Sequence, residues 1–355
     1  MRRVFLRLTT ALAALALLAP ATAGAADDWA SSLYSEGGVE VRADERVFTL
    51  FALFNAMGMN DAPILRKDPI VKRDYDPVRE RVRDLLRIDP KLRPEFEKFF
   101  DSHPQPIRSY IAFVLALGDA PKFEVKGALP KEAANLKGFE ALLAKFHASS
   151  KIGVLFERET AAQRETLKQF AAMVDGPVAK SREILRHPET DTSPRLVLVV
   201  NLLDGRGSGY GVGFPDETYL VVGPLGKEPD ISPAVKAFAR VTVQEAAEKG
   251  FKSLKGGADL FDEVKDSGFA VGAENVADYI AETVARAVAI KATAAEGSSG
   301  KAYDREHKSG FVLIKDMNRG LVLFANQKAK AFDVFLADFL RELDAGTAVA
   351  ALKGN

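Results

Sequence analysis

The chain has no cysteine among its 355 residues, only one tryptophan and only four histidines. The absence of cysteine excludes a disulfide framework, a thiol nucleophile and a cysteine-ligated metal site. The chain also lacks a net charge, with 49 Lys and Arg against 49 Asp and Glu, so there is no overall positive field to draw it to nucleic acid. Its 47% hydrophobic content is that of a globular chain stabilised by packing.

The first 25 residues depart from this even charge balance. Arg2, Arg3 and Arg7 precede an apolar stretch at residues 11–19, and small residues follow it. This pattern predicts a signal peptide over residues 1–25. About ten apolar residues are too few to cross a bilayer, which needs roughly 20, and no later stretch is long enough either. We therefore expect an exported protein of the periplasm or cell exterior without a membrane span.

Apolar residues at helical spacing dominate the rest of the chain and predict an α+β fold that is mostly helical. We expect two regions, a mainly helical one at residues 26–190 and a hairpin followed by helices at residues 191–355. The predicted helices lie at residues 47–57, 136–146, 160–173, 232–254, 275–294 and 331–343.

The strand signal is concentrated between residues 195 and 222. Residues 195–203 (RLVLVVNLL) and 218–222 (TYLVV) are rich in β-branched side chains, and the glycine cluster GRGSGYGVG at residues 205–213 separates them. This order predicts a β-hairpin with the glycines in its turn or in a loop at its edge. The cluster fits neither G-x-G-x-x-G nor the P-loop pattern, and no helix start follows it, so a nucleotide site is not predicted.

Histidine and serine patterns indicate no catalytic or metal site. None of the histidines belongs to an H-x-H, H-x-x-H or H-E-x-x-H group, and each is expected on the surface or at a helix end. No G-x-S-x-G motif occurs, so a serine nucleophile with its base is not indicated. The four histidines are His103, His147, His187 and His307.

Several segments, taken in order, resemble a known family. They are VRADERVFTLFALFNAMG, EFEKFFDSHP, RLVLVVNLLDGRGSGYG, VQEAAEKGF and IAETVARAVAI. In this order they resemble an uncharacterised bacterial family, domain of unknown function 4932, whose members resemble gluzincin-type metallopeptidases. The resemblance implies a zincin-type, metallopeptidase-like helical core with a small antiparallel sheet or hairpin. In such proteins an edge strand precedes a helix with H-E-x-x-H, and a Glu on a later helix completes the zinc site, with an Arg four residues after it.

This chain departs from that motif at both histidines. Aligned on it, Gln244 takes the place of the first zinc histidine, Glu245 that of the general base and Glu248 that of the second histidine. Glu282 matches the later ligand and Arg286 the arginine after it. Two imidazoles at i and i+4 share a helix face and can grip one metal ion. The set here offers only oxygen, which Ca²⁺, Mg²⁺ or Mn²⁺ prefers.

Three interpretations of these residues stay open. In the first, they are polar helix-surface side chains, with Glu245 and Glu248 facing Lys249 or Lys252 and Glu282 paired with Arg286. In the second, they mark a binding cleft without hydrolysis, in which the strand at 195–203 pairs with a peptide or envelope protein. In the third, Glu245 is the base of a divergent metal-dependent peptidase, and only then is zinc or another divalent cation expected as a cofactor. The leading prediction is an exported, non-catalytic binding or interaction protein, a pseudo-peptidase.

Overall fold

The computed structural model describes residues 32–59, 74–267, 269, 272–295 and 297–353. The predicted signal peptide at residues 1–25 lies outside the described residues. From Ser32 onward the chain forms one compact unit. Within the described residues, no helix has the length and apolar character needed to cross a bilayer.

A five-stranded mixed sheet is the β part of the fold. Its strands lie in the order β1-β2-β3-β5-β4, with β2, β3 and β5 parallel to one another and β1 and β4 antiparallel at the two edges. The strands are β1 (Ser32–Tyr34), β2 (Glu40–Arg42), β3 (Arg195–Val200), β4 (Gly209–Gly213) and β5 (Glu217–Val222).

Helices make up most of the remaining described chain, which confirms the predicted α+β, mostly helical class. The helices expected at residues 47–57, 136–146, 160–173, 232–254, 275–294 and 331–343 are all present, with ends shifted by four residues or fewer, except that the helix expected from residue 160 begins at Ile152. The helices are α1 (Glu45–Ala56), α2 (Pro77–Leu85), α3 (Arg93–Ser102), α4 (Ile107–Leu115), α5 (Phe139–Ser149), α6 (Ile152–Met173), α7 (Asp175–Leu185), α8 (Ser232–Gly250), α9 (Gly257–Asp266), α10 (Val276–Thr293), α11 (Ser299–Lys308), α12 (Ile314–Asn326), α13 (Phe332–Glu342) and α14 (Gly346–Lys353).

The prediction that residues 195–203 and 218–222 form a hairpin is wrong, and the sheet is mixed rather than antiparallel. The runs at 195–203 and 218–222 are neighbours, but they are parallel, with Leu198 opposite Leu220. The hairpin is formed by β4 and β5, and the second half of the glycine cluster is β4 itself. The sequence pattern misled because glycines that are typical of a turn here occupy a strand.

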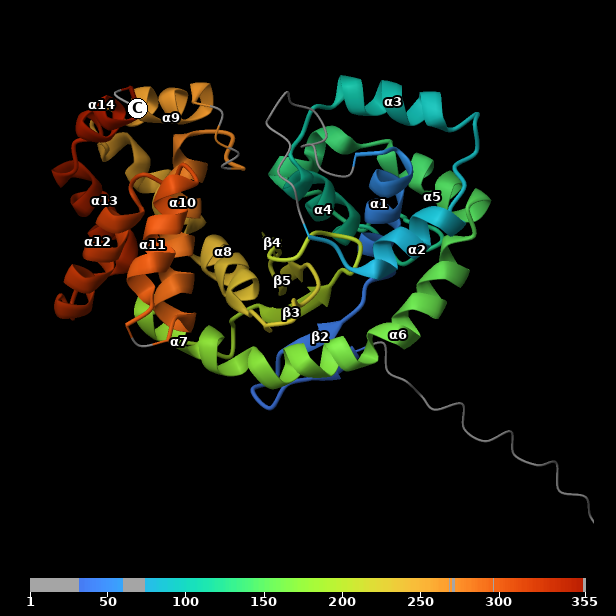
Figure 1. Ribbon diagram of the computed structural model, residues 1–355, viewed down its shortest axis with the longest axis horizontal. Helices are drawn as coiled ribbons and strands as arrows, with labels where there is room; N and C mark the ends of the chain where they lie inside the picture. The colour runs from blue at the N-terminus through green and yellow to red at the C-terminus, as the bar shows by residue number, and fades with distance from the viewer. Residues whose placement is uncertain (1–31, 60–73, 268, 270–271, 296, 354–355) are drawn as a thin grey trace, which may run out of the picture. The chain divides into compact units, whose positions relative to one another are not determined.

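Close packing of α8 on β4 explains why this strand is built on glycine (Figure 1). A Cβ atom on Gly211 would lie well inside van der Waals contact with the Ala237 carbonyl oxygen and 2.6 Å from Val241 Cγ2. A Cβ on Gly209 would collide with the Pro233 carbonyl oxygen in the same way. Successive residues of a strand alternate between its faces, so glycines at two-residue spacing all meet the helix.

Side-chain caps set the beginnings of α8 and α10. Asp230 accepts hydrogen bonds from the N–H and the hydroxyl of Ser232 at 2.8 and 2.9 Å, and Pro233 follows in the first turn. Asn275 accepts a hydrogen bond from the N–H of Asp278 at 3.0 Å. These caps satisfy N–H groups that a helix start leaves unpaired. The two helices that carry the candidate site therefore begin at fixed positions.

Buried apolar side chains form two clusters that meet on α8. The first contains the sheet, α1, α4 and residues of α8 up to Phe238. The second contains Ala239 and Val243 of α8 and most of the buried side chains of α10 and α13. The expected boundary between residues 190 and 191 falls inside the sheet, because β1 and β2 precede it and the other strands follow it.

Candidate functional site

Two rows of charged side chains face each other between α8 and α10. Lys236 and Arg240 lie four residues apart on α8, and Asp278, Glu282 and Arg286 follow one another at the same interval on α10. Residues four apart share one helix face. The rows interrupt helices that are otherwise largely apolar, and Arg240 is only 6% exposed. Buried charges of this kind need partners.

Glu282 lies at the centre of these charges. Its carboxylate is 2.9 Å from Arg286 Nη2, 3.5 Å from Lys236 Nζ and 3.8 Å from Arg240 Nε. Burial alone would raise the pKa of this carboxyl, but the three cations outweigh burial and lower the pKa of Glu282 to about 2. Glu282 is therefore ionised under ordinary conditions and its charge is compensated within the chain.

Two more carboxylates and a fourth cation extend this network. Asp278 accepts a hydrogen bond from Arg240 Nη2 at 2.7 Å and lies 4.0 Å from Arg108 Nη2 of α4. Glu306 of α11 accepts a hydrogen bond from Arg286 at 2.6 Å. These contacts tie α4, α8, α10 and α11 together. We call the seven residues the charged network: Arg108, Lys236, Arg240, Asp278, Glu282, Arg286 and Glu306.

Most of the aligned motif lies outside the charged network. Gln244 donates a hydrogen bond to the Glu248 carboxylate one turn further along α8. The side chain of Glu245 is 78% exposed and pairs with Lys249 at 2.7 Å. Among the described residues, no hydrogen bond or ion pair joins these side chains to Glu282, and no three His, Asp or Glu groups are placed to hold a metal ion.

The groups nearest Glu282 do not fit a zinc ion. Zinc is held by thiolate, imidazole or carboxylate, each of which brings a lone pair. The Lys236 ammonium and the Arg240 guanidinium are donors without an acceptor atom. Of the contacts that the helix-surface interpretation names, Glu245 with Lys249 and Glu282 with Arg286 are present, whereas Glu248 accepts its hydrogen bond from Gln244.

The strand at 195–203 has no free edge for a partner, so that part of the binding interpretation is wrong. β3 is hydrogen-bonded to β2 on one side and to β5 on the other. An added peptide strand needs unpaired backbone groups along a sheet edge. The second neighbour comes from residues 40–42, far away in sequence, and a local pattern does not reveal such a pairing.

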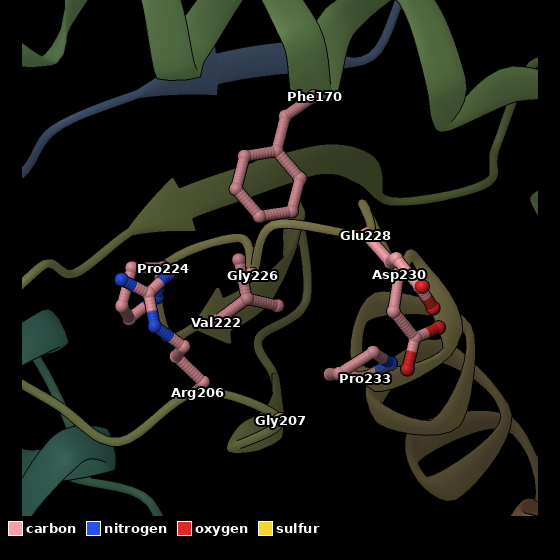
Figure 2. A pocket seen from close by; sticks show the side chains of 10 residues that line it. Phe170, Arg206, Gly207, Val222, Pro224, Gly226, Glu228, Asp230 and Pro233 are labelled. Carbon is pink, nitrogen blue, oxygen red and sulfur yellow. The ribbon is translucent and has the colours of Figure 1, made fainter. Parts of the chain in front are cut away.

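A small pocket of about 270 Å³ opens at the carboxyl end of β5, and the carboxyl ends of parallel strands are a usual place for ligands. Figure 2 shows Arg206 on one side of it, Glu228 and Asp230 on the other, and the Phe170 ring above. Arg206 already pairs with Asp74 at 3.1 Å, and Asp230 already caps α8. Because Arg206 and Asp230 serve the fold, we place the candidate site at the charged network instead.

The histidines lie at helix ends, as expected. His103 is the C-cap of α3, His187 follows Arg186, the C-cap of α7, and His307 lies in the last turn of α11. His147 is in the last turn of α5 but is buried, and its Nε2 lies 2.7 Å from Glu45 Oε1. Its role is thus to hold α5 against α1.

Comparison with known proteins finds no matching family model, no matching curated protein and no matching solved structure. The family resemblance and the zincin-type core therefore stay predictions.

Acid should reveal what Glu282 contributes to stability. Its pKa falls from an ordinary 4.5 to about 2 in the folded chain, so its contribution is fully present above about pH 4.5 and is lost as the pH falls through about 2. We expect Glu282→Gln to lower the free energy of unfolding by on the order of 3 kcal/mol at pH 6, and the difference from the unaltered chain to shrink between pH 4.5 and 2. Urea unfolding at a series of pH values measures this. A difference that stays constant with pH would contradict it.

Proposed function

We propose that this chain is an exported, non-catalytic binding or interaction protein with a metallopeptidase-like arrangement and no working metal site. The observation that carries the proposal is the environment of Glu282, which faces Arg286, Lys236 and Arg240 within 4 Å. A carboxylate compensated by three cations attracts a metal ion poorly, and none of these cations can serve as a second ligand.

The position of Glu245 supports the same proposal. A general base must lie within hydrogen-bond reach of the proton it removes, directly or through one water. Glu245 is instead exposed and paired with Lys249. The packing of the edge strand β4 on α8 supports the scaffold half of the proposal, because the resemblance implies a helix that follows an edge strand. A peptide or envelope protein is the proposed partner, bound elsewhere than along β3.

Metal analysis together with one variant tests this function. Protein purified from zinc-supplemented cultures should hold far less than one zinc ion per chain by elemental analysis. Glu245→Gln should behave like the unaltered chain in a peptide-hydrolysis assay, because Glu245 touches no metal-bound water. Glu165→Gln is the matched control, since Glu165 is 72% exposed on a different helix. Stoichiometric zinc, together with cleavage that Glu245→Gln abolishes and Glu165→Gln preserves, would favour the hydrolase instead.

A further inference from the structure

Lys236 and Arg240 have the spacing on α8 that two metal ligands on one helix would have. They are four residues apart, share one face, and both approach the Glu282 carboxylate, at 3.5 and 3.8 Å. On α10, Glu282 is followed four residues later by Arg286, which is the spacing that the resemblance implies. Two pairs of residues on α8 are therefore candidates for the positions of the two zinc histidines. One is Gln244 with Glu248, and the other is Lys236 with Arg240, eight residues earlier in the chain.

The directions of the two helices distinguish the two candidate pairs. Arg240 reaches both Asp278 and Glu282, whereas Lys236 reaches Glu282. Moving toward the C-terminus of α10 thus means moving toward the N-terminus of α8, so the helices are antiparallel. Along α8, Lys236 lies beside Glu282 and Arg240 lies beside both Glu282 and Asp278. Gln244 comes one turn after Arg240, and therefore lies further from Glu282 than either cation.

Contacts of the edge strand give a second, independent observation. The glycines of β4 meet α8 at Pro233, Ala237 and Val241. These turns of the helix are the ones that carry Lys236 and Arg240, and the glycine contacts end before Gln244. The edge strand, the two cations and Glu282 are thus brought to one place on α8.

We infer that Lys236, Arg240 and Glu282 occupy the three ligand positions of the metallopeptidase-like scaffold, and that the ammonium and guanidinium groups replace its metal ion. Two monovalent cations supply the same charge as one divalent ion. Ala237 follows Lys236 where the glutamate of H-E-x-x-H would stand, so this position also lacks a general base. The inference rests on the proposed function, because it explains how the scaffold lost its metal and stayed folded.

Histidines placed at the two candidate pairs test the inference. Lys236→His with Arg240→His should complete a two-histidine, one-glutamate set with Glu282, which is a known zinc ligand set. We expect one zinc ion per chain by elemental analysis and the visible absorption of tetrahedral cobalt when Co²⁺ is added. Gln244→His with Glu248→His, the matched control with the same spacing, should show neither. Adding Glu282→Gln to the first pair should weaken zinc binding by about tenfold or more, since even outer-shell changes reach that size.

Each outcome decides for or against the inference. The zinc-loaded K236H/R240H chain should not hydrolyse peptides, because Ala237 provides no base. If this chain is unfolded without metal, refolding by zinc in circular dichroism supports the inference, since metal binding then drives folding. A K236H/R240H chain that folds without taking up zinc, or stays unfolded with zinc, overturns it, as does equal zinc binding by the control pair. Stoichiometric zinc in the unaltered chain would contradict the proposed function instead, so the two failures are distinguishable.

Discussion

Replacing Arg240 with methionine should lower the free energy of unfolding by about 3–5 kcal/mol, the range found when one partner of a buried ion pair is removed. Arg240 is 6% exposed and contacts Asp278 at 2.7 Å and Glu282 at 3.8 Å. Methionine keeps an apolar stem of similar length but removes the charge. Glu282 retains Lys236 and Arg286, whereas Asp278 loses its closest cation, so most of the loss arises at Asp278.

Urea unfolding with two further variants separates this effect from a general loss of packing. Arg341→Met removes an ion pair of the same 2.7 Å length on α13, but Arg341 is 66% exposed, so no measurable change is expected. Adding Asp278→Asn to Arg240→Met should recover part of the lost stability, because the uncompensated carboxylate is then gone. Equal losses for Arg240→Met and Arg341→Met, or no recovery in the double variant, would contradict this account of the charged network.

The helical framework could be predicted because its signals are local. The apolar run at 47–57 is α1, and the segment at 275–294 is α10, with Asn275 as its cap. Apolar spacing and capping residues act within a few turns of the chain, so a single sequence carries them. Strand partners are not local. Nothing near Glu40 in the sequence indicates that it lies opposite Val197.

The candidate site could be predicted only in part. The motif alignment included Glu282 and Arg286, but the side chains of α8 that contact Glu282 are Lys236 and Arg240, and Gln244 contacts Glu248 instead. A usable signal was present, since Lys236 with Arg240, and Asp278 with Glu282, are charges repeated every four residues in apolar helices. Such rows indicate buried ion pairs. The sequence does not say which row faces which, because that depends on the packing of α8 against β4 and α10.

Gly211→Ala should be the most disruptive single-methyl change in the sheet, lowering the free energy of unfolding by about 3 kcal/mol or more, at or beyond the upper end of ordinary overpacking. The added Cβ would collide with the Ala237 carbonyl oxygen and approach Val241 Cγ2 at 2.6 Å. A backbone carbonyl inside a helix cannot rotate away as a side chain can. The collision can therefore be relieved only if α8 moves away from β4. Lys236 and Arg240 would move with the helix.

Two other glycines serve as graded controls. A Cβ on Gly213, in the same strand, meets only Val241 Cγ1 at 3.1 Å, so Gly213→Ala should lower stability much less than Gly211→Ala. Gly176 lies in α7 with nothing within 4 Å of its added Cβ, and Gly176→Ala should raise stability by up to about 1 kcal/mol through helix propensity. Urea unfolding of the three variants should give this order. Equal stability of Gly211→Ala and Gly213→Ala would show that the Ala237 carbonyl of α8 does not lie close against Gly211 of β4. The placement of the charged network beside the edge strand would then also be wrong.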